Sequence, residues 1–373
     1  MKRLFALLLV LTLLLCGCAK KPADTPDPSG TSEPTTPTQE TTQSTQAPTD
    51  KPTDAPTQAP TNPPVLNYRN PLTGEKIAEP WSGQMVAVMV NNIKDSMPQY
   101  GLSQADIIYE IQEEGYITRN MAIYSDVSKV GTVGSIRSTR SYFVSVAASY
   151  DAYLVHCGTS THARGGGYDS TGKKIADWKD FDQFYNANYF FRDYDRYDKG
   201  YAWEHTLFTS GEQLAKGLSG KSQSTAKDYF TFKEGVELPK SETANEVTVT
   251  FKGGKTTTFT YDAATGLYTR SQYGGETVDA ANNQTVKVKN VLALYTNQKG
   301  SCNCSYGGHQ FYDTIGSGEG YAAVNGKIVA IKWSRASVND PYVYTLSDGS
   351  ALELDVGSTY IAVVGIKHPI SYK

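Results

Sequence analysis

Residues 104–142, QADIIYEIQEEGYITRNMAIYSDVSKVGTVGSIRSTRSY, decide the fold of this chain because they combine a core-like apolar pattern with many charges. Residues 107–111 have the apolar composition of a buried strand. Because side chains alternate along a strand, Glu110 and Glu114 are predicted to lie on the same face of it. The sequence therefore predicts a buried strand that carries carboxylates.

The second half of this stretch predicts a further strand and a helix. A short strand is predicted over residues 120–124, and a helix with an apolar face over residues 138–149. Arg137 and Arg140 lie three positions apart at the predicted helix start. We expect the chain to be organised around the acidic strand and this doubly basic helix start.

The charge balance argues against a nucleic-acid partner. The 373 residues include 35 Lys and Arg and 38 Asp and Glu, which gives a formal net charge of −3. A nucleic-acid-binding domain usually carries a basic patch or stripe and a high isoelectric point. No nucleic-acid partner is therefore expected.

The first residues predict an exported protein with a lipid anchor. A basic start is followed by an apolar run over residues 4–15, which is too short to span a bilayer comfortably. The Leu-Cys-Gly-Cys sequence that ends at Cys18 resembles the lipobox of bacterial lipoproteins. By that resemblance, residues 1–17 are a signal peptide and Cys18 carries the lipid at the extracytoplasmic face of the cell membrane. The alternative is an ordinary signal peptide that is cut at a small residue.

The rest of the chain is predicted to be α+β, preceded by a tether. Residues 18–66 are rich in Thr and Pro and nearly free of large apolar residues, so a disordered tether is expected. An N-terminal α/β, sandwich-like domain is predicted over residues 67–218, and a connector over residues 219–241. A smaller, mostly antiparallel β domain is predicted over residues 242–373.

Strand patterns are the basis of this division. The nearly continuous apolar run over residues 84–90 is typical of a strand buried on both faces, and residues 152–156 repeat it. In the second half, Gly253-Gly254 separates two alternating segments, and Asn-Gly at 325–326 is the strongest short hairpin signal. A last strand over residues 359–364 is expected to close the chain within the β domain.

Several motifs keep a fixed order from residue 67 to the end of the chain. They occupy residues 70–74, 90–92, 98–106, 114–119, 134–140, 333 and 354–361. They resemble the successive motifs of the YerB-like lipoproteins. The resemblance implies an envelope lipoprotein, mainly of Gram-positive bacteria, with two domains of uncharacterised function. It implies no catalytic residues, and no cofactor is expected.

The first candidate site is an anion-binding site at the predicted helix start. The first N–H groups of a helix have no intrahelical partner, and two arginines beside them suit a carboxylate or a phosphate. Peptidoglycan and teichoic acid carry such groups, so both are candidate partners, as is a wall-active protein. The alternative is that the arginines pair with nearby glutamates as a structural network. The candidate ligand-binding residues are Arg137, Arg140, Arg119, Glu110, Glu114, His156, His205 and Asn91.

The alternative function is a cell-wall hydrolase that uses Glu110 or Glu114 as its acid or base. Four residues along a strand correspond to about 13 Å, whereas glycoside hydrolysis uses carboxylates roughly 5 to 9.5 Å apart. His156 lies at a predicted strand end before a glycine-rich loop, and it could meet His205 and Glu110 in space. A hydrogen-bonded, structural His156 is the other interpretation.

No metal site is predicted, because metal sites need at least three converging ligands. His156, His162 and His205 offer the right atoms, but no spacing in the sequence requires them to converge. Cys302 and Cys304 lie one residue apart without a second cysteine pair, so two free thiols or a strained disulfide are the expected state.

Overall fold

The computed structural model describes most of the chain beyond the predicted tether. The described residues are 66–160, 174–175, 178–299, 309–365 and 370–373. The predicted signal peptide, Cys18 and the tether lie outside them, as do His162, Cys302 and Cys304. Within the described residues, no helix is long and apolar enough to cross a membrane.

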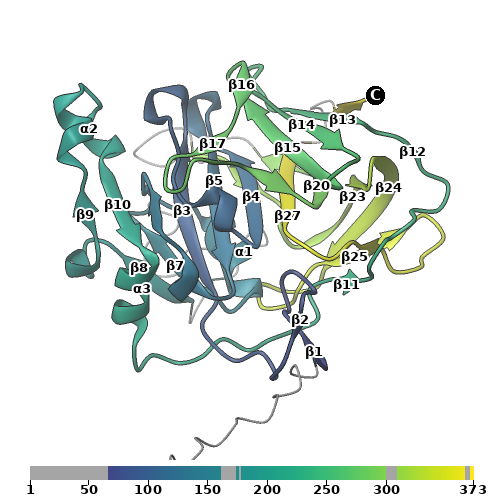
Figure 1. Cartoon of the computed structure of the whole chain (residues 1–373), viewed down its shortest axis with the longest axis horizontal. Helices are drawn as coiled ribbons and strands as arrows, with labels where there is room; N and C mark the ends of the chain where they lie inside the picture. Colours follow the sequence, from purple (N-terminus) through teal and green to yellow (C-terminus); the bar gives the residue numbers. More distant parts are fainter. Residues whose placement is uncertain (1–65, 161–173, 176–177, 300–308, 366–369) are drawn as a thin grey trace, which may run out of the picture. The chain divides into compact units, whose positions relative to one another are not determined.

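A mixed sheet of eleven strands brings the two halves of the chain together (Figure 1). In sheet order its strands are β12 (Glu242–Thr243), β24 (Lys327–Arg335), β23 (Gly316–Val324), β20 (Asn290–Thr296), β27 (Thr359–Gly365), β4 (Ile107–Gln112), β5 (Thr118–Tyr124), β3 (Val86–Asn92), β7 (Tyr153–His156) and β8 (Lys179–Asp182), with β25 (Val343–Leu346) paired to β24. The predicted buried strands are confirmed, because every residue of β3, β4, β5 and β7 is buried.

Strand β27 joins the two halves. It pairs in parallel with β20 on one side and with β4 on the other, and all of its residues are buried. The prediction that this strand closes the chain within an antiparallel β domain is wrong. Burial on both faces suits a central parallel strand, and β28 (Ile370–Tyr372) follows it in the chain. The predicted domain boundaries stay a prediction.

An antiparallel sheet from the second half covers one face of the central sheet. Its strands are β16 (Gly275–Glu276), β15 (Leu267–Gln272), β14 (Thr256–Asp262), β13 (Glu246–Thr250) and β28, with β19 (Lys287–Val288) on β15. Phe259 and Tyr268 of this sheet share a buried cluster with Val88 and Tyr360 of the central sheet. The hairpin predicted at Gly253-Gly254 is confirmed, and both glycines have φ near +87°, which favours glycine.

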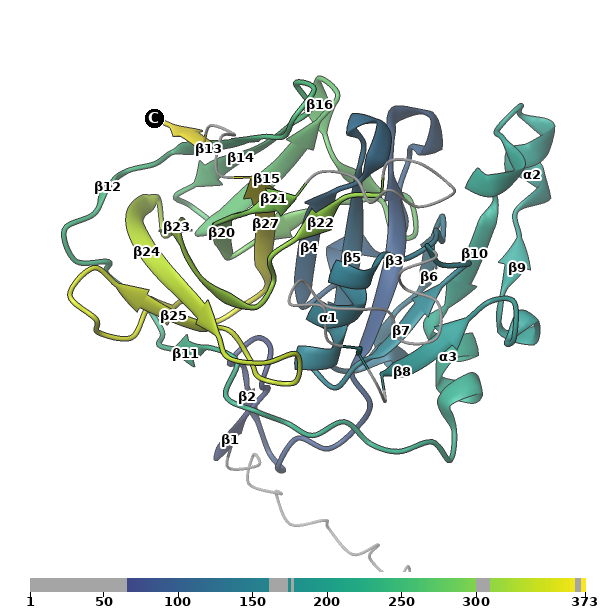
Figure 2. The same ribbon diagram turned by 180° about the vertical axis from the view of Figure 1, so that it is seen from behind.

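Helix α1 (Ser141–Ser149) covers the opposite face of the central sheet, in front of β3 to β5 in Figure 2. Phe143 and Val146 pack there with Met89 and Met121. The helix is shorter than predicted, because Arg140 is its N-cap residue and has extended backbone angles. Arg137 is therefore not part of the helix, which corrects the predicted start.

The remaining elements are short. They are β1 (Tyr68–Arg69), β2 (Lys76–Ile77), β6 (Thr132–Gly134), β9 (Phe191–Arg192), α2 (Tyr194–Asp198), β10 (Leu207–Ser210), α3 (Gly211–Leu218), β11 (Thr231–Phe232), β17 (Val278–Asp279), β18 (Gln284–Thr285), β21 (Gln298–Lys299), β22 (Phe311–Tyr312) and β26 (Glu353–Leu354). Strand β11 pairs in parallel with β26, so the predicted connector is fastened to the C-terminal half.

Candidate functional site

Strands β3, β4 and β7 run in the same direction, so their C-terminal ends lie at the same end of the central sheet. This end of the sheet is the edge referred to in the following paragraphs. Strand β7 is parallel to β3, and both β3 and β4 are antiparallel to β5 between them. The carboxyl ends of parallel strands are where sheets of this kind commonly bind ligands. Most of the predicted site residues lie at this edge.

Segment 135–139 lies between β3 and β7 at this edge. Arg137 donates its backbone N–H to Met89 O at 3.1 Å, and Cys157 donates its backbone N–H to Arg137 O at 3.1 Å. The segment is thus hydrogen-bonded to both strands where they separate. This position places the two predicted arginines beside the start of α1.

Two arginines at this edge are held by glutamates. The buried Arg119 of β5 lies 2.6 Å from the carboxylate of Glu113, and its guanidinium also donates to Ser138 O. Arg140 lies 2.8 Å from Glu114 and 3.6 Å from Glu113. The structural-network interpretation therefore holds for Arg119 and Arg140. This cluster of Arg119, Glu113, Arg140 and Glu114 is called the edge cluster below.

The edge cluster shifts the pKa values of its members. Burial raises the pKa of Glu114, but its bond with Arg140 outweighs burial and lowers the pKa to about 2. Burial lowers the pKa of Arg140, but the charges of Glu113 and Glu114 outweigh it and leave that pKa raised. Burial lowers the pKa of Arg119 to about 10, against the opposing charge of Glu113. All three groups are charged at neutral pH.

Arg137 differs from its two neighbours. Its guanidinium has no carboxylate within salt-bridge distance among the described residues, and its Nε is buried without a hydrogen-bond partner. The side chain is partly exposed. Arg137 therefore has positive charge and N–H donors that the edge cluster does not use.

His205 connects Arg137 with an open cleft. Asn91 Nδ2 lies 3.0 Å from His205 Nδ1. Burial lowers the pKa of His205, and the charge of Arg137 lowers it further. A cleft of about 470 Å³ beside His205 is also lined by Lys94 and Lys199. The structure thus places Asn91 against His205, whereas the predicted meeting of His205 with His156 and Glu110 is not among the contacts of the described residues, and a shared site with Arg137 stays a prediction.

Glu110 does not belong to this site. It is fully buried between the two sheets, where its carboxylate accepts hydrogen bonds from Tyr360 at 2.8 Å and from Arg270 at 3.3 Å. Lys255 lies 3.9 Å away. Burial raises the pKa of Glu110, but Lys255 and Arg270 outweigh burial and lower it. No local pattern in the sequence signals this pairing, because Arg270 is 160 residues further along the chain.

Glu114 and Glu110 do not share a strand face, which corrects the predicted pair. Strand β4 ends at Gln112, and Glu114 begins a short 3-10 helix, Glu114–Tyr116. Glu114 also lies 3.1 Å from His309 Nδ1. The geometry therefore does not bring two free carboxylates together.

His156 is held on both sides of its ring. Its Nε2 lies 2.8 Å from Asp180, its Nδ1 lies 3.0 Å from Gly158 O, and its ring stacks on Trp178. These contacts favour the structural interpretation and do not bring His156 to Glu110. In the part of the chain that the structure describes, no group of three His, Cys, Asp or Glu side chains could hold a metal ion.

Both halves of the chain match one protein family. The family is described as "Protein of unknown function (DUF3048)"; its N-terminal domain matches residues 72–225 and its C-terminal domain matches residues 247–361. This chain belongs to the YerB-like family. The resemblance predicted from the sequence motifs is thereby confirmed.

A relative and a solved structure agree with this assignment. The chain is 27% identical over 300 residues to "Putative lipoprotein YerB" of Bacillus subtilis (strain 168), which covers 79% of this chain and 85% of that protein. The crystal structure of YerB from Bacillus subtilis matches with a TM-score of 0.68 and covers 82% of this chain and all of that one. The predicted α+β class is consistent with this two-domain architecture.

Proposed function

We propose that the chain is a membrane-anchored lipoprotein of the bacterial cell envelope. In this proposal, lipid on Cys18 holds it at the extracytoplasmic face of the membrane. The lipobox-like sequence over residues 15–18 supports the anchor, as does the name of the YerB relative. A tether of Thr and Pro would hold the folded part away from the membrane surface.

The folded part, in this proposal, binds an anionic component of the cell wall. The observation that carries this is the guanidinium of Arg137, which lies among paired arginines but has no carboxylate partner in the described residues. A guanidinium binds a carboxylate or a phosphate through two parallel hydrogen bonds. Peptidoglycan peptides supply carboxylates and teichoic acids supply phosphates.

The surroundings of Arg137 favour a negatively charged ligand. The cleft beside His205 is lined by Lys94 and Lys199 with one carboxylate, Asp95, and the start of α1 adds the partial positive charge of a helix N-terminus. The edge cluster holds Arg119 and Arg140 in place and so limits their motion. A bound anion would therefore meet the unpaired guanidinium of Arg137, beside arginines that are already paired with glutamates.

Binding is better supported than hydrolysis. A wall hydrolase would need an acid and a base that converge on an open space. Glu110 is buried between the sheets, and Glu114 is bonded to Arg140. We therefore propose a non-catalytic role for this site.

Cosedimentation of the purified full-length chain with purified cell wall tests the proposal. We expect Arg137→Ala to weaken wall binding at least tenfold while the melting temperature stays unchanged. Lys332→Ala is the matched control, because it also removes one positive charge from an exposed position. Walls stripped of teichoic acid distinguish a phosphate ligand from a peptidoglycan carboxylate. Equal binding by wild type and Arg137→Ala would refute an anion site at Arg137.

A further inference from the structure

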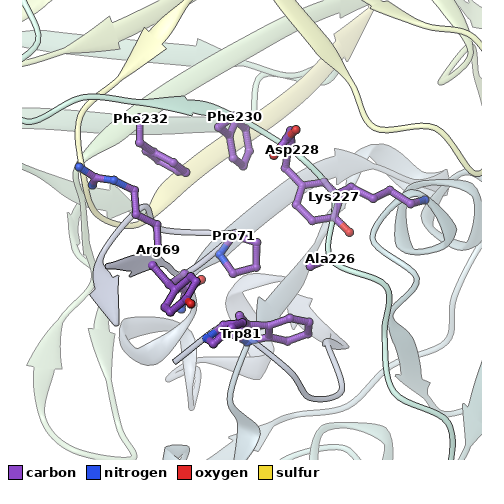
Figure 3. A pocket seen from close by; sticks show the side chains of 12 residues that line it. Arg69, Pro71, Trp81, Ala226, Lys227, Asp228, Phe230 and Phe232 are labelled. Carbon is purple, nitrogen blue, oxygen red and sulfur yellow. The ribbon is translucent and has the colours of Figure 1, made fainter. Parts of the chain in front are cut away.

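A second cavity of about 460 Å³ shares no residue with the edge cluster or the cleft beside His205 (Figure 3). Its volume is in the range of small-molecule sites. Residues 68–71 and 226–232 supply much of the lining and lie outside both matched family segments. The cavity therefore lies where the start of the folded part meets the predicted connector.

Aromatic rings form the walls of this cavity. Figure 3 shows Phe230 and Phe232 on one side and Trp81 on the opposite side. Their contacts hold the rings in place: Trp81 Nε1 donates to Ser125 O at 3.3 Å, and Phe230 stacks on Tyr344 with ring centroids 5.8 Å apart. Rings that are already ordered lose little conformational entropy when a ligand binds.

Tyr68 adds an exposed residue to the lining. Its relative exposure is 45%, so its ring is open to solvent. Neither Tyr68 nor Trp81 pairs with another aromatic ring among the described residues. Both rings are therefore available to pack against an apolar surface of a ligand.

Charged groups of both signs line the same cavity. Arg69 donates one hydrogen bond to Gly74 O at 2.6 Å and lies 4.0 Å from Glu234. Lys227 donates to Ser149 O at 3.5 Å and to Asn339 O, so each cation keeps at least one further N–H donor. The exposed Asp228 makes no hydrogen bond or ion pair with the described residues. Residues with donors and an acceptor thus line the same cavity as the aromatic rings, although Figure 3 shows the head groups of Arg69 and Lys227 on opposite sides of it.

This combination selects against several ligand classes. Charges of both signs line the cavity, so it presents no uniform field that would select a simple anion or a simple cation. A proline-rich peptide suits an aromatic groove, but proline has no N–H to donate to a carboxylate. A neutral ligand with hydroxyl groups and apolar faces satisfies both the rings and the charges.

We propose that this cavity is a saccharide-binding site. A pyranose ring would pack its apolar C–H face against Trp81 or Tyr68. One hydroxyl would donate to Asp228, and others would accept from Arg69 and Lys227. The site is independent of the anion site proposed at Arg137, so each proposal can fail without the other.

Isothermal titration calorimetry of the purified full-length chain tests this assignment, with triacetylchitotriose and maltotriose as neutral probes. We expect saturable binding of at least one probe, weakened at least tenfold by Tyr68→Ala and by Asp228→Asn. Both substitutions lie at exposed positions and are expected to leave the fold intact. Tyr185→Ala and Asp198→Asn are the matched controls, because they remove an exposed ring and an exposed carboxylate elsewhere.

Three results would overturn the proposal. The first is the absence of binding to both saccharides. The second is unchanged affinity in Tyr68→Ala and Asp228→Asn. The third is binding of a proline-rich peptide that depends on Tyr68 while neither saccharide binds, which would assign the cavity to a peptide. Unchanged saccharide affinity in Arg137→Ala is expected and separates this site from the anion site.

Discussion

Two charged clusters lie on opposite faces of β5 and differ in how completely they are buried from solvent. Thr118 donates to Glu110, which lies between the two sheets with Arg270 and is fully buried. The next residue, Arg119, points to the other face and pairs with Glu113 in the edge cluster. Adjacent residues of one strand thus serve two separate networks.

The clusters differ in how much of their charged side chains solvent can reach. The Glu110 carboxylate accepts hydrogen bonds from several side chains and has no exposed surface. The edge cluster lies at the ends of the strands, where Arg140 and Glu114 keep some exposure and Arg137 stays outside the pairing. The charges between the sheets are therefore closed off from solvent, whereas the edge keeps partly exposed charged groups.

The largest expected effect comes from breaking the buried network. Glu110→Gln would leave Arg270 and Lys255 without their carboxylate in a buried site. Loss of one partner of a buried ion pair typically costs about 3–5 kcal/mol of the free energy of unfolding. Urea denaturation measures this loss. Glu319→Gln, at an exposed position, is the control. If Glu110→Gln lowers the free energy of unfolding no more than Glu319→Gln does, a stabilising role for the network is refuted.

A smaller effect is expected at the edge cluster. Arg140→Ala removes the ion pair with Glu114, but Glu113 keeps its contact with Arg119. We expect a loss of about 1–3 kcal/mol, since the remaining groups stay partly satisfied or reach solvent. Arg137→Ala, measured beside it, should change the free energy of unfolding by less than about 0.5 kcal/mol. Equal losses in both variants would show that Arg137 also has a structural role.

The smallest expected effect is the contribution of the edge cluster to the pH dependence of stability. The folded-state pKa of Glu114 is lowered from its ordinary value of 4.5 to about 2. A lowered carboxyl pKa adds stability that is present above pH 4.5 and is lost as the pH falls towards 2. Glu114→Gln should therefore lower the melting temperature at pH 6 and have a smaller effect near pH 2. An equal difference at both pH values would contradict an ionic contribution of Glu114.

Local patterns were enough to predict β3, β4, β5, β7, β27 and two hairpins, but not β15, β20 or most of the short strands. The alternation around Gly253-Gly254 and the apolar run that became β3 depend on a few neighbouring residues, and both predictions are confirmed. The helix start was less well predicted. The apolar pattern over residues 138–149 predicted a helix that begins next to Arg137. Hydrogen bonds to β3 and β7 instead hold segment 135–139 outside the helix, which begins at Ser141.

The candidate site was predicted in part. Arg119, Arg140, Asn91 and His205 do lie at the edge of the sheet. Asn91 is near the end of β3, Arg119 is near the start of β5, and Arg140 is the N-cap residue of α1. Glu110 was assigned to the same site because it belongs to the same sequence stretch. Alternation along a strand shows that two residues share a face, but it does not show which element covers that face.

The sequence alone determined the strand pattern, the family and the residues that carry charge, since these depend on composition and short-range spacing. Only the tertiary structure decided that β27 joins the two halves and that Glu110 pairs with Arg270. It also decided that residues 68–71 and 226–232 form one cavity. These contacts link residues between 69 and 252 positions apart in the chain, and the packing of the whole chain selects such partners.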